Sequence, residues 1–145
     1  MKRLIPFVFL LTLPFISCIT KTTVMKEVYS EYYTLAEQYY TARNYAKALD
    51  FYTRAKGSSE LENMCDYKIA TTYVQMGDYT SSAQLFSLLL QKDPDNASIM
   101  SSLAYVYGKN GSYDKAILLY ETILGKDIYD TVSVKNLIIL YNHIG

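Results

Sequence analysis

The chain has 145 residues, half of them hydrophobic, and its basic and acidic side chains balance to a net charge of zero. This length allows one domain with a continuous core. Nucleic acid and anionic lipid are held by a surplus of Lys and Arg, so the neutral composition argues against both as electrostatic partners. The two cysteines do not suggest a disulfide framework.

The N-terminus has the pattern of a secretory signal peptide. Lys2 and Arg3 precede an apolar run over residues 4–16, which contains two prolines. A membrane-spanning helix needs about 20 apolar residues, and this run is shorter, which favours a signal peptide over a permanent span. We therefore expect residues 1–17 to direct export.

Residues 15–18 resemble a bacterial lipobox, with Phe15 at the position where Leu is usual. The resemblance implies that Cys18 is acylated, with palmitate among its chains, and becomes the mature N-terminus. Several acyl chains on one residue give stable membrane anchoring. Ordinary cleavage near Ser17 and an uncleaved anchor are the alternatives.

Residues 18–28 are expected to contain the lipidated cysteine and a short tether. Thr22 or Thr23 is suited to cap a helix that starts there. If about six residues stay extended, they span at most about 20 Å, which holds the following domain close to the membrane. We therefore expect a lipid-anchored protein of the cell envelope, with the outer membrane or the periplasmic face favoured.

A period of 34 residues organises the chain from residue 29 to residue 145. Tyr39, Tyr73 and Tyr107 are separated by this period, and so are the turn glycines Gly77 and Gly111. Two helical patterns occur within each period, because small and apolar residues recur at spacings that place them on one helical face. The units are 29–62, 63–96, 97–130 and a partial unit, 131–145.

This pattern resembles the tetratricopeptide repeat (TPR), a helical hairpin with the same period. The resemblance implies an all-α solenoid of helical hairpins, with three repeats and a final single helix. Two departures concern local packing: Arg43 replaces a usual turn glycine, and Ser82 replaces a packing alanine.

In this family the first helix of each hairpin lines a concave groove, and the resemblance implies which positions face it. Four of the sixteen tyrosines fall at such positions. Tyrosine combines apolar area with a hydroxyl and is frequent at recognition sites. The alternative is that tyrosine is only the filler that this chain prefers. The expected partner-binding residues are Tyr33, Glu37, Tyr40, Tyr67, Lys68, Thr71, Tyr105 and Lys109.

The groove positions also argue against one known class of ligand. Family members that bind the acidic C-termini of chaperones use Lys, Asn and Arg at five of these positions. The present chain has Tyr33, Glu37, Lys68, Ser98 and Ser102 there. That carboxylate clamp is therefore absent from the sequence.

No pattern in the sequence indicates catalysis. The single histidine, His143, has no acid, base or metal-ligand partner at a suitable spacing, and the glycines form no phosphate-binding loop. We expect no enzyme activity, no cofactor and no metal.

The last helical pattern is apolar nearly all round, since residues 137–141 are Leu-Ile-Ile-Leu-Tyr. A helix that closes a solenoid needs a polar outer face. We expect a partner or a second copy to cover residues 131–145; the alternative is a truncated reading frame that has lost the next helix.

Together these features predict a membrane-anchored TPR adaptor that binds another cell-envelope protein through its groove, in envelope or outer-membrane protein assembly. The client is not identified by any residue. The alternatives are a structural oligomer assembled through the C-terminal helix and an accessory subunit of a cell-wall enzyme.

Overall fold

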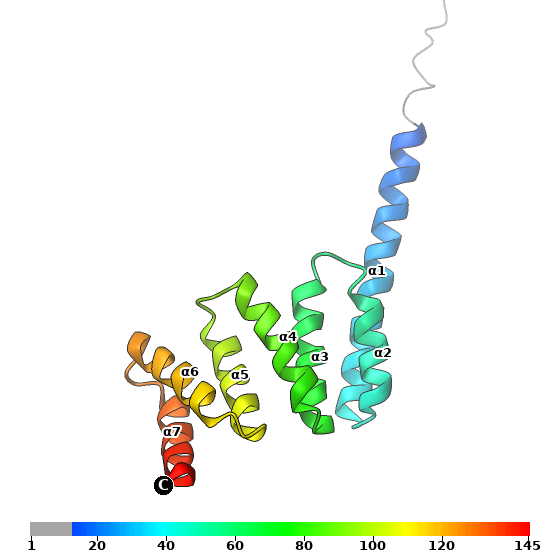
Figure 1. Ribbon diagram of the computed structural model, residues 1–145. Coiled ribbons are helices and arrows are strands. Elements are labelled where there is room, and N and C mark those ends of the chain that lie inside the picture. Colours follow the sequence, from blue (N-terminus) through cyan, green and yellow to red (C-terminus); the bar gives the residue numbers. More distant parts are fainter. Residues whose placement is uncertain (1–12) are drawn as a thin grey trace, which may run out of the picture.

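The computed structural model describes the backbone of residues 13–145 and the side chains from residue 23 onward. Within that part every regular element is a helix, and the helices follow one another in a row from α1 at one end to α7 at the other (Figure 1). Most of the expected signal peptide, residues 1–12, lies outside the described residues. The helices are α1 Leu13–Thr41, α2 Tyr45–Ala55, α3 Glu62–Met76, α4 Tyr79–Lys92, α5 Ala97–Lys109, α6 Tyr113–Lys126 and α7 Thr131–Ile144.

Each helix packs against the next one in the chain, which gives three helical hairpins and one final helix. The hairpins are α1 with α2, α3 with α4, and α5 with α6 (Figure 1). The prediction of an all-α solenoid of helical hairpins is confirmed.

The core repeats with the same period as the sequence. A small residue on each first helix is fully buried, which allows the second helix to approach closely, and one large ring on each second helix fills the remaining space. The small residues are Ala36, Ala70 and Ala104, and the rings are those of Tyr52, Phe86 and Tyr120.

Ser82 fits the core although an alanine is usual at its position. Its side chain is fully buried, and its hydroxyl donates a hydrogen bond of 2.9 Å to the backbone oxygen of Ala70 on the facing helix. A buried hydroxyl is tolerated when it has a partner. The serine therefore adds a bond between α3 and α4 without opening a cavity.

The turn inside each hairpin uses a left-handed residue. Gly77 and Gly111 have φ values of 78° and 77°, and Arg43 has a φ of 58° at the corresponding position. The turn is thus kept in the first repeat even without glycine, at the cost of a conformation that is strained for a residue with a Cβ atom.

The residue after each turn begins the second helix. Asp78 accepts a hydrogen bond from the backbone N–H of Ser81 at 3.0 Å, and Asn44 accepts one from Lys47 at 3.3 Å. Both side chains therefore cap their helices as N-cap residues do. Ser112 holds the same position before α6, but its hydroxyl accepts no cap hydrogen bond.

The first helix is longer than the sequence suggested. α1 begins at Leu13, so the segment after Cys18, which we expected to be partly extended, is helical. No glycine or proline follows Pro14 until Gly57, so nothing in the sequence interrupts this helix. Its N-terminal part projects beyond the end of α2 (Figure 1). None of the described helices combines the length and the apolar character needed to span a membrane.

The connection between the first two hairpins is held firmly. Gly57 lies against the ring of Tyr29, where an added Cβ would come within 2.3 Å of Cε1, so only glycine fits without a shift. The buried carboxylate of Asp66 pairs with Lys56 at 2.5 Å and lies 3.9 Å from Lys92. These contacts join α2, α3 and α4.

Replacing Arg43 by Gly should stabilise the fold by about 0.5–1 kcal/mol, because relief of the left-handed strain exceeds the added chain entropy of glycine. Urea unfolding at neutral pH measures the difference. The matched change Gly77→Ala should destabilise by about 1 kcal/mol. Nothing lies within 4 Å of the Cβ added there, so this loss would come from the backbone. An Arg43→Gly variant that is less stable than the wild type would contradict the strain assignment.

Candidate partner-binding site

Two neighbouring pockets form one groove along the first helices of the hairpins. A pocket of about 300 Å³ lies among α5, α6 and α7, and one of about 330 Å³ lies mainly among α3, α5 and α7. Tyr105, Tyr120 and Asn136 line both, so the two pockets adjoin. We call this pair of pockets the groove.

Four of the eight expected partner-binding residues line the groove. Tyr40 and Thr71 lie in the second pocket, Lys109 lies in the first, and Tyr105 lies between the two. Tyr105 is 43% exposed, and the ammonium of Lys109 lies 5.4 Å from the centre of its ring. This cation–π contact holds both side chains at the boundary between the pockets.

Tyr33 and Tyr67 are largely engaged with the scaffold. The ring of Tyr67 meets that of Phe86 edge-on at 5.3 Å, and its hydroxyl lies 3.1 Å from Oγ of Ser102, which links α3 to α5. Tyr33 meets Tyr52 in the same manner at 5.7 Å. Both tyrosines are partly buried, so less of each ring is available to a partner than of Tyr105.

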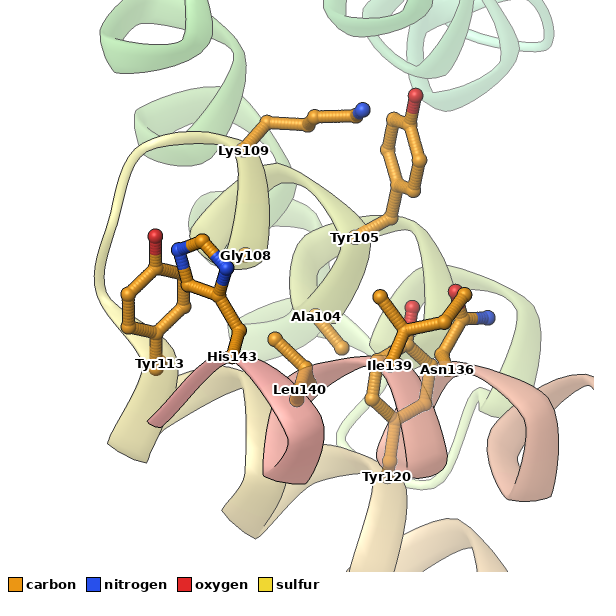
Figure 2. A pocket seen from close by; sticks show the side chains of 10 residues that line it. All are labelled: Ala104, Tyr105, Gly108, Lys109, Tyr113, Tyr120, Asn136, Ile139, Leu140 and His143. Atoms are coloured by element: carbon orange, nitrogen blue, oxygen red, sulfur yellow. The ribbon is translucent and has the colours of Figure 1, made fainter. Parts of the chain in front are cut away.

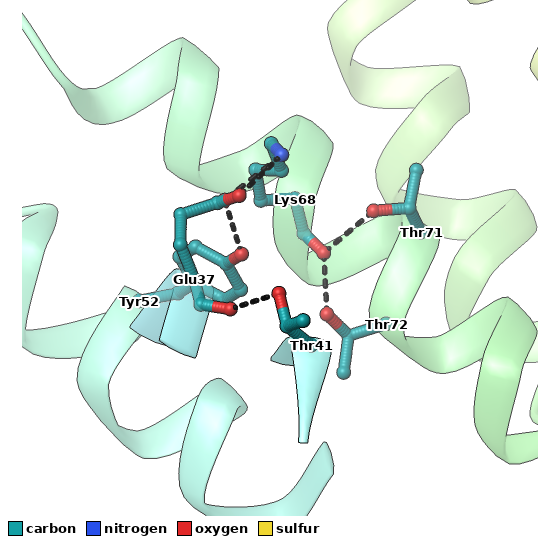
Figure 3. A network of polar contacts seen from close by, with 6 residues as sticks. All are labelled: Glu37, Thr41, Tyr52, Lys68, Thr71 and Thr72. Atoms are coloured by element: carbon teal, nitrogen blue, oxygen red, sulfur yellow. Dashed lines mark hydrogen bonds and ion pairs between the residues drawn. The ribbon is translucent and has the colours of Figure 1, made fainter. Parts of the chain in front are cut away.

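Glu37 and Lys68 form an ion pair across the first two repeats (Figure 3). The ammonium of Lys68 on α3 lies 2.8 Å from Oε1 and 3.0 Å from Oε2 of Glu37 on α1. The buried Tyr52 of α2 donates its hydroxyl to the same carboxylate. The charge of Lys68 is therefore already offset inside the protein.

The pKa values of this network follow from its contacts. Partial burial raises the pKa of Glu37, but hydrogen bonds from Lys68 and Tyr52 lower it more, so the result lies below the usual 4.5. For Lys68, burial lowers the pKa, yet the hydrogen bond to Glu37 outweighs it and the pKa rises. Burial, then the bond to Glu37, raises the pKa of Tyr52 far above its ordinary value. The ion pair is thus fully charged at neutral pH.

Five residues of α7 line the groove, and the sequence analysis assigned none of them to it. Four of them lie 34 positions after a residue already assigned to a groove position in the third unit, so continuing the register by one unit would have found them. These four are Val132, Asn136, Ile139 and His143, and the fifth is Leu140.

The apolar residues of α7 divide between the core and the surface. Leu137 and Leu140 are buried against the third hairpin, so they are not part of an exposed patch. Val134, Ile138 and Tyr141 are exposed and lie on one helical face at spacings of four and three residues. The exposed apolar surface that a partner could bury is therefore smaller than the whole segment 131–145 that the sequence suggested.

The described residues contain no group of three or more His, Cys, Asp and Glu side chains able to hold a metal ion. His143 meets the ring of Tyr113 edge-on at 4.8 Å. Burial raises the pKa of the Cys65 thiol to about 11, so this cysteine is protonated at neutral pH.

A row of helical hairpins with a groove along its first helices defines a protein-interaction scaffold of the solenoid class. Residues 67–131 match the family model of the tetratricopeptide repeat, and the chain has the fold of solved TPR domains. The TPR domain of Sgt2 from Aspergillus fumigatus has a TM-score of 0.68 at 19% identity, covering 80% of this chain and 78% of that one. The first TPR domain of Spaghetti (RPAP3), solved with the HSP90 peptide SRMEEVD bound, has a TM-score of 0.70 at 13% identity, covering 80% and 92%.

Two curated relatives are similar in sequence. A lipoprotein of Treponema pallidum, described only as uncharacterized, is 28% identical over 101 residues, which is 70% of this chain and 52% of the relative. Tetratricopeptide repeat protein 21B of Xenopus laevis is 24% identical over 132 residues, covering 68% of this chain and 10% of that protein. The chain thus spans about half of the first relative and a tenth of the second.

Changing Glu37 to Gln should destabilise the fold by about 1 kcal/mol at pH 7, after allowance for solvent screening of this partly exposed pair. The folded pKa of Glu37 is lowered, so its contribution is present above pH 4.5 and is lost as the pH falls through the folded value. Urea unfolding at pH 7 and at about pH 3 tests this. The two proteins should differ only at pH 7, whereas the exposed Glu31→Gln control should match the wild type at both.

Proposed function

We propose that the chain is a membrane-anchored adaptor that binds a segment of another cell-envelope protein in the groove. The observation behind this proposal is the pair of adjoining pockets centred on Tyr105. TPR domains are interaction modules, and helix-lined grooves accept extended segments or amphipathic helices.

The form of the groove supports a protein ligand over a small metabolite. It extends over residues from α1, α3, α5 and α7, and its side chains combine tyrosine rings and aliphatic groups with Thr71 and Asn136. Enrichment in aromatic side chains is typical of surfaces that bind other proteins. Adjoining small pockets of this kind can each accept a different side chain of one bound polypeptide segment.

The ligand differs from the HSP90 peptide SRMEEVD that is bound by the first TPR domain of Spaghetti. In the present chain, the clamp positions of the first two repeats hold Tyr33, Glu37 and Lys68, and the two charges pair with each other. A free carboxylate would meet the negative charge of Glu37 here. We therefore place the main contacts farther along the groove, from Tyr40 to α7.

Attachment to a membrane of the cell envelope is part of the same proposal. It rests on the lipobox resemblance at Cys18 and on similarity to the Treponema lipoprotein. Cys18 belongs to the N-terminal part of α1, which is continuous with the helix that pairs with α2. A client at the outer membrane or the periplasmic face fits this attachment.

Photo-crosslinking in the native cell should identify one dominant partner from probes at Tyr105 and Ile139. A probe at Leu118 on the outer helix α6 is the matched control, because Leu118 and Ile139 are equally exposed, at 64%. Mass spectrometry of the adducts names the partner. The same adducts from Leu118 as from the groove, or none from the groove, would refute the groove proposal.

A second candidate is self-association through the exposed face of α7, formed by Val134, Ile138 and Tyr141. Ile138 holds the position of Ala36, Ala70 and Ala104 in the complete repeats, where a second helix packs closely. It is instead 55% exposed. An exposed apolar face of this kind favours association.

Ile138→Asp should convert self-associated protein to monomer if this face joins two copies, because a charge would then be buried in the contact. Light scattering at high protein concentration measures the mass. Leu118→Asp on α6 is the control and should change nothing. A wild-type protein that stays monomeric at high concentration would exclude this candidate and leave the groove proposal intact.

A further inference from the structure

Side chains from α5, α6 and α7 line the first pocket of the groove (Figure 2). Its floor consists of the buried residues Ala104, Tyr120 and Leu140, and Tyr105 and Ile139 form its walls. Its volume of about 300 Å³ is at the lower end of the range for small-ligand sites. This size suits a single aromatic or branched aliphatic side chain.

The rim of this pocket is cationic. Lys109 and His143 are its ionisable lining residues apart from tyrosines, and no carboxylate lines it. Figure 2 shows the Lys109 side chain extending away from the floor, beside Tyr105. Its ammonium lies 5.4 Å from the Tyr105 ring centre and is within 4.0 Å of no carboxylate among the described residues. A ligand is thus offered an apolar cavity with an unneutralised ammonium beside it.

The two lysines among the expected partner-binding residues, Lys68 and Lys109, differ in this respect. Lys68 is paired with Glu37 at 2.8 Å, whereas Lys109 has only a tyrosine face as its partner. A ligand carboxylate can form an ion pair with Lys109, whereas the charge of Lys68 is already paired with Glu37. Charge complementarity therefore locates an acidic group of the ligand at the α7 end of the groove.

We propose that this pocket is the anchor site for a partner segment in which a large apolar side chain stands next to Asp or Glu. The apolar side chain enters the pocket between Tyr105 and Ile139, and the neighbouring carboxylate pairs with Lys109. Anchors of this kind, an apolar group in a pocket with a polar contact at its edge, dominate many interfaces. The inference rests on the proposed adaptor function and adds the chemistry of the ligand.

Selection of a random twelve-residue peptide library on the immobilised full-length chain tests the proposal. Enriched peptides should contain Phe, Tyr, Trp, Leu or Ile beside Asp or Glu. Lys109→Glu should weaken the binding of these peptides about tenfold, since attraction is replaced by repulsion. Selection on this variant should enrich Lys or Arg in place of the acid.

Lys115→Glu is the matched control. Lys115 lies on α6 and, like Lys109, has its ammonium 5.4 Å from a tyrosine ring centre, that of Tyr107. This variant should select the same acidic peptides as the wild type. Enrichment without an acidic preference, a Lys109→Glu variant that keeps the wild-type preference, or no enrichment at all would overturn the anchor proposal. If the anchor proposal fails in this way but probes at Tyr105 still crosslink to one partner in the cell, the adaptor function remains supported. If those crosslinks are absent as well, both the anchor proposal and the adaptor function are refuted.

Discussion

Close packing of a small residue against a second helix, repeated every 34 positions, is the constraint on which the structure depends. Ala36, Ala70 and Ala104 allow the helices of each hairpin to approach, and the rings of Tyr52, Phe86 and Tyr120 fill the space behind them. This packing orients the first helices alike. One face of each first helix packs against the second helix of its hairpin. Another face lines the groove, and the residues on it recur with the same period.

The hairpins and much of the groove could be predicted because they follow from that period. Tyr40, Thr71, Tyr105 and Lys109 were assigned from the repeat register, and all four line the groove. The turn at Arg43 was recognised by its position even though the residue type is unusual. Four of the five groove residues of α7, all except Leu140, follow the same register, so their omission reflects where the repeat was taken to end.

Other features could not be predicted, because they depend on contacts without a period. Glu37 and Lys68 are separated by 31 residues, and their pairing needs the orientation of α1 relative to α3 as well as the hydroxyl of Tyr52. The division of Leu137 and Ile138 between core and surface depends on how α7 rests on the third hairpin. The helical state of residues 18–28 was likewise not predicted. The amino-acid composition of this segment is compatible both with an extended tether and with a helix.

The Glu37–Lys68 ion pair lies beyond the α1 end of the groove, and Lys109 lies at the α7 end. The charges of Glu37 and Lys68 cancel, whereas Lys109 keeps its positive charge. A bound segment with an acidic residue near one end would therefore bind in a single orientation, with that end at Lys109. The polarity of the client chain relative to α1, and thus to whatever α1 is attached to, would follow from a single internal ion pair.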